Sequence, residues 1–350
     1  MKQKMILGLS LLAMVGLWTG CTDEEPPVAY SGTTGGGEEI AFRVQGGVPE
    51  TTKTTATTAD KVDAFVVYGT DNKSTSTNIF EGVTVARQVD GGFTYSPKRF
   101  YSVGAASAEF VAYSPVSAKV TNPVTTTLMT TGVTFDYEVV APDNSEGKTT
   151  QEDLLIAATP VSSPSATAVN FAFTHALSRI FVKAKSSMKE TVVIKGLTLK
   201  NLYPEGTLTG TPGTPWTWEW ITSGTKTVFP YALANTGIAV PAGIGTGASP
   251  NNVPVLVTSM EQGMMVIPQK LTWDNGSTHD PAEDFYLEVT YDVANLTNQV
   301  AKINLTKDYL FEANTQYAIT IEFSSSVTNL IEIGFTISVG DFANDPTTMP

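Results

Sequence analysis

Short segments with apolar residues at every second position recur along almost the whole chain, and this pattern constrains the fold more than any other. A β-strand places successive side chains on opposite faces, so each such segment can bury one face of a sheet. Segments 133–139 and 317–323 alternate clearly, and Gly, Pro, Asn and Asp separate many of the segments. No window of a dozen residues has a helical period. We therefore predict an all-β protein with about 14 strands in two tandem β-sandwiches, spanning residues 39–178 and 179–350.

The first 20 residues have the pattern of a secretory signal peptide. Lys2 and Lys4 precede an apolar run that ends near Leu17, and this run is too short for a membrane-spanning helix of about 20 residues. Cys21 is the only cysteine in the chain, and its position resembles a bacterial lipoprotein signal, in which the cysteine becomes the lipidated first residue. The alternative is a plain secretory peptide with an incidental cysteine. Residues 21–38 are predicted to form a flexible, lipidated tether because they are rich in Gly, Ser and Thr.

Composition excludes several classes of function. The net charge of −13 argues against nucleic acid as a partner. The absence of Lys- or Arg-rich runs argues against an electrostatic membrane-surface site. If Cys21 carries lipid, no cysteine remains for a disulfide bond, a thiolate metal ligand or a nucleophile. The hydrophobic content of 41% is that of a globular protein with a core.

Candidate catalytic and metal-binding residues do not form a recognisable site. His175 and His279 lie far apart in the sequence, and neither belongs to a serine or zinc motif. His175 is predicted to be a structural, hydrogen-bonded histidine. Asp274–Asp280 with Glu283 and Asp284 could supply calcium ligands, but their spacing departs from an EF-hand and favours a turn. We therefore expect no enzyme activity, no cofactor and no metal.

Six segments in a fixed order resemble the fimbrillin family of Bacteroidales, and specifically its Mfa-like branch. They are spread over most of the chain after the tether: Tyr95–Tyr101, Glu109–Pro115, Gln151–Thr159, Phe171–Ile180, Met264–Gln269 and Ile333–Phe342. The resemblance implies two transthyretin-like sandwiches, export as a lipoprotein to the outer membrane, and assembly into surface fimbriae with other fimbrial subunits. It also implies that a protease cuts after a basic residue near the first strand, and that a strand of a neighbouring subunit fills the gap.

The two ends of the globular region contain features that suit such assembly. The last predicted strand, 330–340, has the strictest alternation in the chain and is a candidate donor strand; its apolar face is Ile331, Ile333, Phe335, Ile337 and Val339. The alternative is an ordinary strand of its own domain. Near the start, Lys53 lies in a polar, threonine-rich stretch and Arg43 lies within the first predicted strand, 40–44. Both are candidate cleavage sites, and Lys53 is the better one because Arg43 should resist a protease while its strand is paired.

An aromatic row supports a second hypothesis. Trp216, Trp218 and Trp220 would share one face of a strand, and an exposed row of rings could stack on sugars. The alternative function is therefore a surface glycan-binding lipoprotein. A host or bacterial surface receptor is a possible partner in either case, and burial of the three rings would argue against the platform.

Overall fold

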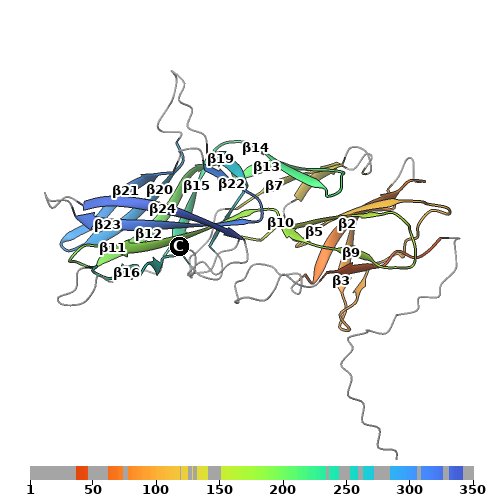
Figure 1. Cartoon of the computed structure of the whole chain (residues 1–350), viewed down its shortest axis with the longest axis horizontal. Helices are drawn as coiled ribbons and strands as arrows, with labels where there is room; N and C mark the ends of the chain where they lie inside the picture. Colours follow the sequence, from red (N-terminus) through yellow and green to blue (C-terminus); the bar gives the residue numbers. More distant parts are fainter. Residues whose placement is uncertain are drawn as a thin grey trace, which may run out of the picture. The chain divides into compact units, whose positions relative to one another are not determined.

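The structure is a computed structural model, and strands dominate the part of the chain that it describes (Figure 1). This part forms 24 strands, β1 to β24, so the all-β prediction is confirmed. None of its helical segments is long and apolar enough to cross a membrane. The described residues are 37–45, 62–73, 78–118, 120–124, 128, 132–140, 151–233, 236–243, 253–258, 263–271, 284–305, 309–325 and 331–341.

The strand count exceeds the sequence prediction because many of the additional strands are very short. Strands of two or three residues, such as β10 (Thr174–His175) and β16 (Ile238–Val240), are too short to show a period of two. Longer predicted strands are found close to their expected positions: segment 133–139 is β7 (Val133–Glu138) and segment 317–323 lies within β23 (Thr315–Ser325).

A six-stranded antiparallel sheet has the order β10-β8-β5-β2-β3-β4. Both of its faces are buried. Along β2, Phe65 and Val67 belong to one hydrophobic core, whereas Val66 and Tyr68 belong to another. Burial on both faces explains why this strand is an almost continuous apolar run. The strands are β2 Ala64–Asp71, β3 Phe80–Arg87, β4 Phe93–Thr94, β5 Ala108–Ser114, β8 Leu155–Val161 and β10 Thr174–His175.

Two smaller sheets supply the side chains that pack on these faces. β1 and β9 pair in parallel, and Phe42 of β1 contacts Phe65 of the six-stranded sheet. On the other face, a sheet with the order β14-β13-β7-β6 contributes Phe135, whose ring contacts that of Tyr68. The strands are β1 Phe42–Val44, β9 Val169–Phe171, β6 Val120–Val124, β7 Val133–Glu138, β13 Glu205–Thr211 and β14 Thr217–Ser223.

The sheet that contains β7 crosses the predicted domain boundary at residue 178. β7 precedes the boundary, yet it pairs along its length with β13, which follows it. The described residues all belong to one compact unit, and one hydrophobic core extends in sequence from Val66 to Phe323. The division into 39–178 and 179–350 therefore stays a prediction, and β13 and β14 pack with the strands assigned to the first domain.

The remaining strands form a second group of sheets. One has the order β17-β11-β23-β24 with β18 also on β11; another has the order β15-β12-β20-β21 with β16 also on β12; β19 pairs with β22. Their facing sides form a core that includes Ile180, Leu197, Val289 and Ile319. The strands are β11 Ser178–Ser186, β12 Val192–Leu202, β15 Thr227–Ala232, β16 Ile238–Val240, β17 Val255–Leu256, β18 Met264–Val266, β19 Gln269–Leu271, β20 Tyr286–Val293, β21 Leu296–Asn304, β22 Tyr309–Phe311, β23 Thr315–Ser325 and β24 Ile331–Asp341.

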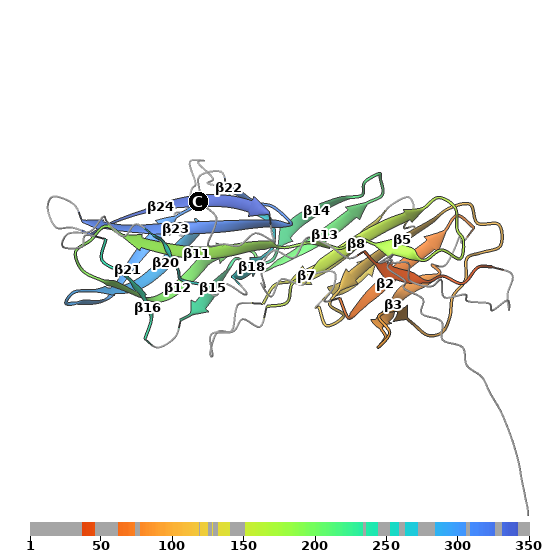
Figure 2. The same ribbon diagram turned by 60° about the horizontal axis from the view of Figure 1, so that its bottom comes forward.

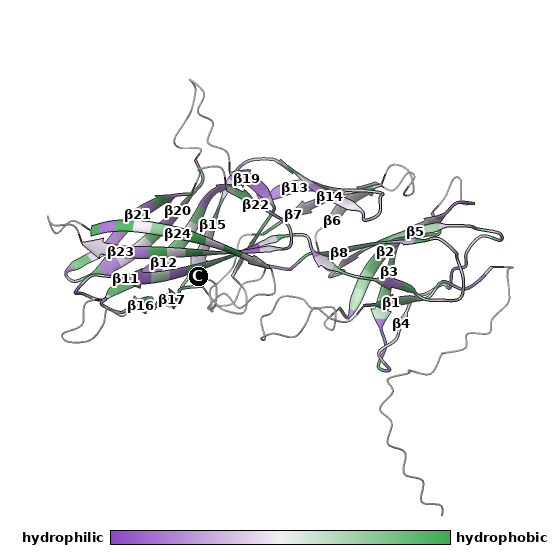
Figure 3. Cartoon of the chain, in the orientation of Figure 1, coloured by the Kyte–Doolittle hydropathy of each residue, from purple (hydrophilic) through white to green (hydrophobic). Residues whose placement is uncertain are grey.

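The last strand, β24, lies at the edge of its sheet. It pairs antiparallel with β23 from Thr315↔Asp341 to Ser325↔Ile331, and Figure 2 shows β11, β23 and β24 side by side in this order. Figure 3 shows the alternation of hydrophobic and hydrophilic residues along strands of this group. An edge strand of this kind has ladder hydrogen bonds on one side only.

Candidate assembly site

Residues 38–45, which include β1, form a first-strand segment whose two edges meet different partners. On one edge, the Ile40 amide donates to the Arg99 carbonyl oxygen and the Tyr101 amide donates to the Glu38 carbonyl oxygen, both at 3.0 Å. On the other edge, the Val169 amide donates to the Ala41 carbonyl oxygen at 2.8 Å, next to the parallel pairing with β9. The segment is therefore an inserted strand with neighbours on both sides, and its removal would leave backbone groups unpaired on the edge that each neighbour now shares with it.

The inward side chains of this segment are fully buried. Ile40 is 1% exposed and Phe42 is 3% exposed. The Phe42 ring stacks on Phe171 with the ring centroids 5.6 Å apart. It also contacts four further rings, those of Phe65, Phe80, Tyr95 and Phe110. We call the space that Phe42 fills among these five rings the aromatic cavity. A much smaller side chain would leave a void there, because protein cores are packed without large voids.

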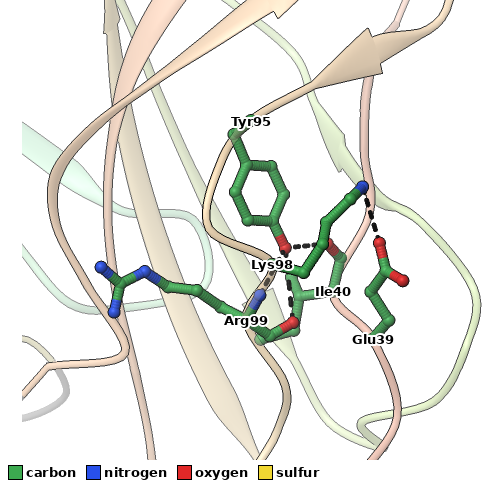
Figure 4. Close-up of polar contacts among 5 residues, drawn as sticks. All are labelled: Glu39, Ile40, Tyr95, Lys98 and Arg99. Carbon is green, nitrogen blue, oxygen red and sulfur yellow. Dashed lines mark hydrogen bonds and ion pairs between the residues drawn. The ribbon is translucent and has the colours of Figure 1, made fainter. Parts of the chain in front are cut away.

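Polar contacts fix the same segment from the side of residues 95–99 (Figure 4). The Tyr95 hydroxyl donates a hydrogen bond to the Ile40 carbonyl oxygen and accepts one from the Arg99 amide at 3.4 Å. The Lys98 Nζ lies 2.7 Å from Glu39 Oε1. The Lys98 ammonium group also lies over the Tyr95 ring, 5.2 Å from its centroid. We use the name first-strand seat for all the groups that hold this segment. They are the aromatic cavity, Lys98, Tyr95, the backbone of residues 99–101 and the backbone of β9.

Tyr95 makes the stability of the seat depend on pH. Burial raises the pKa of Tyr95 to about 12. In the unfolded chain the phenol ionises near pH 10. The contribution of the protonated Tyr95 to the free energy of unfolding is therefore fully present below pH 10, and it is lost as the pH rises from 10 to about 12. We expect the melting temperature of the wild type to decline more steeply over this range than that of Tyr95→Phe, measured by circular dichroism. Equal slopes would contradict this prediction.

The two candidate cleavage residues fall in different parts of the chain. Arg43 lies in β1 opposite Asn170 of β9, and its side chain is exposed. Lys53 lies outside the described residues, as does Cys21, the predicted lipidation site. The polar stretch that contains Lys53 follows the first-strand segment in the sequence. A cut there would break the covalent link between the segment and the strands that follow it. Only non-covalent contacts would then hold the segment in the seat.

The candidate donor strand coincides with β24, which is paired with β23 of the same chain. Four of its five apolar residues lie opposite Tyr317, Ile319, Ile321 and Phe323, and Ile331 lies opposite Ser325. The four residues of β23 from Tyr317 to Phe323 are at most 1% exposed. The residues of β24 itself are less well covered. Phe335 is 39% exposed and Val339 is 56% exposed, while Ile331, Ile333 and Ile337 are partly buried. β24 is thus an edge strand with incompletely buried apolar side chains.

The tryptophan row faces inward. Trp216 is buried, and its indole N–H donates to the Glu109 carboxylate at 3.1 Å. The Trp218 ring stacks on Phe135, with centroids 6.4 Å apart. The Trp220 indole N–H donates to the Ala176 carbonyl oxygen at 2.8 Å. Because the rings pack against the core and the N–H groups of Trp216 and Trp220 are used internally, this arrangement gives no support to a glycan-binding platform.

A buried charged cluster of Asp153, His175 and Arg179 lies near the junction of β10 and β11. The sequence did not predict a role for Asp153 or Arg179. His175 Nδ1 lies 2.8 Å from Asp153 Oδ2, as suits the predicted structural histidine. Arg179 is 0% exposed; burial lowers its pKa to about 10, and the charge of Asp153 acts in the opposite direction. A signal was present in the sequence, since Arg179 lies inside an apolar run. Tyr95 and Lys98 had no comparable signal, because they meet residues 39 and 40 only through the fold.

The described residues contain no cluster of three or more His, Cys, Asp or Glu side chains that could hold a metal ion. The acidic stretch Asp274–Glu283, considered for calcium, lies outside the described residues. Asp284 is buried and its carboxylate accepts a hydrogen bond from Asn304 at 3.3 Å. Within the described residues, this aspartate is therefore engaged in a structural contact.

Comparison with known proteins places the chain in a family. A crystal structure of a fimbrial protein from Bacteroides vulgatus aligns with a TM-score of 0.57 and 17% identity, over 87% of this chain and 99% of that one. Structures assigned to cell adhesion from Bacteroides uniformis and Bacteroides ovatus align at TM-scores of 0.48 and 17% identity, over 87% of this chain and 98% and 97% of theirs. No curated protein matches the sequence. The sequence model of the fimbrillin-like family matches residues 51–339, so the chain belongs to the fimbrillin-like family.

Proposed function

We propose that the protein is a structural and adhesive subunit of cell-surface fimbriae, assembled by removal of the first-strand segment and strand exchange between subunits. As a member of its family the chain is a structural protein and not an enzyme. The observation that carries the proposal is the first-strand seat. Residues 38–45 fill an aromatic cavity and pair on both edges, and a polar stretch with a cleavable Lys53 follows them in the sequence.

The physical chemistry of the seat favours refilling after the segment leaves. An empty seat exposes unpaired backbone groups of residues 99–101 and β9, and such edges pair readily with another chain. It also exposes the cavity that holds Ile40 and Phe42. Each of these side chains gains roughly 1.5–3 kcal/mol on burial, so an incoming strand with matching apolar residues recovers this energy. Backbone pairing then gives affinity, and the cavity gives selectivity.

Cys21 has a delivery role in this proposal. Lipid on Cys21 would hold the precursor at the outer membrane, and cleavage after Lys53 would separate residues 21–53 from the rest of the chain. The acidic residues that follow Cys21, Asp23 to Glu25, resemble the export signal of surface-exposed lipoproteins. The released subunit would then join other fimbrial subunits, and a surface receptor would be the partner of the finished fimbria.

The cleavage step gives a direct test. We expect fimbriae isolated from cells to contain a protein that begins at Thr54, measured by N-terminal sequencing and lipid analysis. Lys53→Ala is expected to leave most of the protein unassembled on size-exclusion chromatography. Lys73→Ala is the matched control, since Lys73 is an exposed lysine in a turn after β2 and its loss should not change assembly. Assembled protein that still begins at Cys21 would refute the proposal.

A further inference from the structure

Along the described strands, the chain passes repeatedly between two groups of sheets. The first group is the six-stranded sheet with the two smaller sheets that pack on it, and it includes β13 and β14. The second group contains β11, β12 and the strands from β15 onwards. The chain enters the second group between β10 and β11, returns between β12 and β13, and leaves the first group again between β14 and β15. We call the region of these crossings the joint.

The backbone at the first crossing is bonded to both groups. The Ala176 amide donates to the Leu154 carbonyl oxygen at 2.8 Å, and the Ala176 carbonyl oxygen accepts from the Trp220 indole at 2.8 Å. These two partners belong to the first group. The next carbonyl oxygen, that of Leu177, accepts from the Asn314 amide of the second group at 3.1 Å. The change from one group to the other is therefore made within a single peptide link.

Beside this crossing, the side-chain amide of Gln151 takes the place of a neighbouring strand. The Met265 amide donates to Gln151 Oε1 at 2.8 Å, and Gln151 Nε2 donates to the Met265 carbonyl oxygen at 2.8 Å. Met265 belongs to β18, whose pairing with β11 places it in the second group. Gln151 Nε2 also donates to the Val140 carbonyl oxygen, shortly after β7 of the first group, at 2.9 Å. One side chain thus connects the backbones of both groups.

A second glutamine makes the same arrangement at the crossing from β12 to β13. The Tyr203 amide donates to Gln269 Oε1 at 3.0 Å, and Gln269 Nε2 donates to the Tyr203 carbonyl oxygen at 3.2 Å. Gln269 Nε2 also donates to the Ile267 carbonyl oxygen at 3.0 Å. Gln269 is buried, at 6% exposure. Its amide therefore fixes the link residue through both backbone groups, as a paired strand would.

Both positions need a side chain with two N–H donors and one acceptor. Gln151 and Gln269 each meet two carbonyl oxygens and one backbone N–H. A primary amide supplies this set. An ionised glutamate has the same shape but only acceptors, so its carboxylate would face two carbonyl oxygens at either position. Unpaired polar groups in the interior are unfavourable, so both positions favour glutamine over its isosteric acid.

We infer that Gln151 and Gln269 are amide clamps, which lock the two groups of sheets into one rigid body that opens at the joint only on global unfolding. Apolar residues of one core also span both groups, but the hydrophobic effect is non-directional and does not fix an angle. Hydrogen bonds have preferred distances and angles, so the clamps fix the position of one group on the other.

This inference goes beyond the proposed function and is independent of how subunits assemble. It has a mechanical consequence for a fimbria, and only this consequence rests on the proposed function. A subunit held through the first-strand seat and through β24 is loaded at one site in each group. The load then crosses the joint, and a clamped joint transmits it without bending.

Native-state hydrogen exchange of the unmodified, full chain gives the first test. We expect the amides of Met265 and Tyr203 to exchange as slowly as those of Val111 in β5 and Ile319 in β23, because all four open only on global unfolding. Exchange of Met265 and Tyr203 that is faster than both core amides by about 100-fold or more would overturn the inference, since the joint would then open by itself.

Spin labels on the full chain carrying Cys21→Ser measure the rigidity of the joint. Thr84→Cys in β3 and Val300→Cys in β21 place labels on exposed residues of different groups. Val228→Cys with Val300→Cys is the control pair, because β15 and β21 belong to one sheet. By pulsed electron paramagnetic resonance, we expect narrow distance distributions for both pairs. A broad distribution for the pair in different groups alone would contradict a rigid joint.

Removal of the clamps should loosen the joint and leave each group intact. We expect Gln151→Glu/Gln269→Glu to broaden the distance distribution between the two groups and to leave that of the control pair unchanged. Gln88→Glu introduces the same charge on an exposed hairpin, where Gln88 donates to the Ala86 carbonyl oxygen at 3.4 Å, and should change neither distribution.

The single variants remain informative if the double variant does not fold. Gln151→Glu should speed exchange of the Met265 amide by about 10- to 100-fold, with a smaller change at Val111. If the distribution between the groups stays narrow and Met265 stays protected without the clamp, the apolar core alone locks the joint and the inference is wrong. Cleavage after Lys53 and assembly are measured separately, so this failure would leave the proposed function standing.

Discussion

Phe42→Ala is expected to lower the free energy that holds the first-strand segment in place by about 3–5 kcal/mol, the usual cost of truncating a buried phenylalanine. The side chain is 3% exposed and touches five aromatic rings, which cannot all move to close the space. The Val169 amide donates to Ala41, so its native-state hydrogen exchange reports opening of the segment. We expect this amide to exchange faster by two orders of magnitude or more.

Arg43→Ala is the matched control on the same strand. Arg43 is exposed, so its truncation should change stability by less than about 0.5 kcal/mol. The two variants change adjacent residues and leave the backbone pairing in place. Similar exchange rates of Val169 in both would show that the cavity does not hold the segment.

Asp153→Ala is expected to destabilise the protein by about 3–5 kcal/mol, the range for breaking a buried ion pair by removing one member. The Asp153 carboxylate contacts His175 at 2.8 Å, and its charge raises the pKa of the fully buried Arg179 against the effect of burial. Without it, the guanidinium charge loses a compensating carboxylate. Trp220 donates to Ala176, next to His175, so tryptophan fluorescence during urea unfolding follows this region.

Two further variants test the cause of the Asp153 effect. Glu322→Ala removes a surface ion pair with Lys185, 3.0 Å long, and should cost less than about 1 kcal/mol. The double variant Asp153→Ala/Arg179→Met removes both charges and should recover part of the stability lost by the single variant. Equal destabilisation by Asp153→Ala and Glu322→Ala would contradict a buried electrostatic role.

The sequence predicts only part of the first-strand seat. Ile40 and Phe42 share a face by the period of two, so the sequence predicted their side of the first strand. Glu39 and Lys98 lie far apart in the chain, and no local pattern connects them.

Local patterns predicted several strands, but they did not predict which sheets pack together or which strands pair. Alternation shows which residues share a face, but not which sheet covers that face. The three tryptophans share a face as predicted, and only the packing on Phe135 and Ala176 showed that it is an inner one. Similarly, β7 and β13 pair across the predicted boundary, because strand pairing depends on contacts between distant segments.

The sequence by itself determined the all-β class, the positions of many of the longer strands, the family resemblance and the alternating last strand. These follow from side-chain periodicity and turn residues, which act over a few neighbouring positions. The tertiary structure decided that β2 is buried on both faces, that Lys98 and Tyr95 meet the first strand, and that β24 lies at an edge. These features arise from contacts between segments far apart in the chain, and local pattern contains no information about such partners.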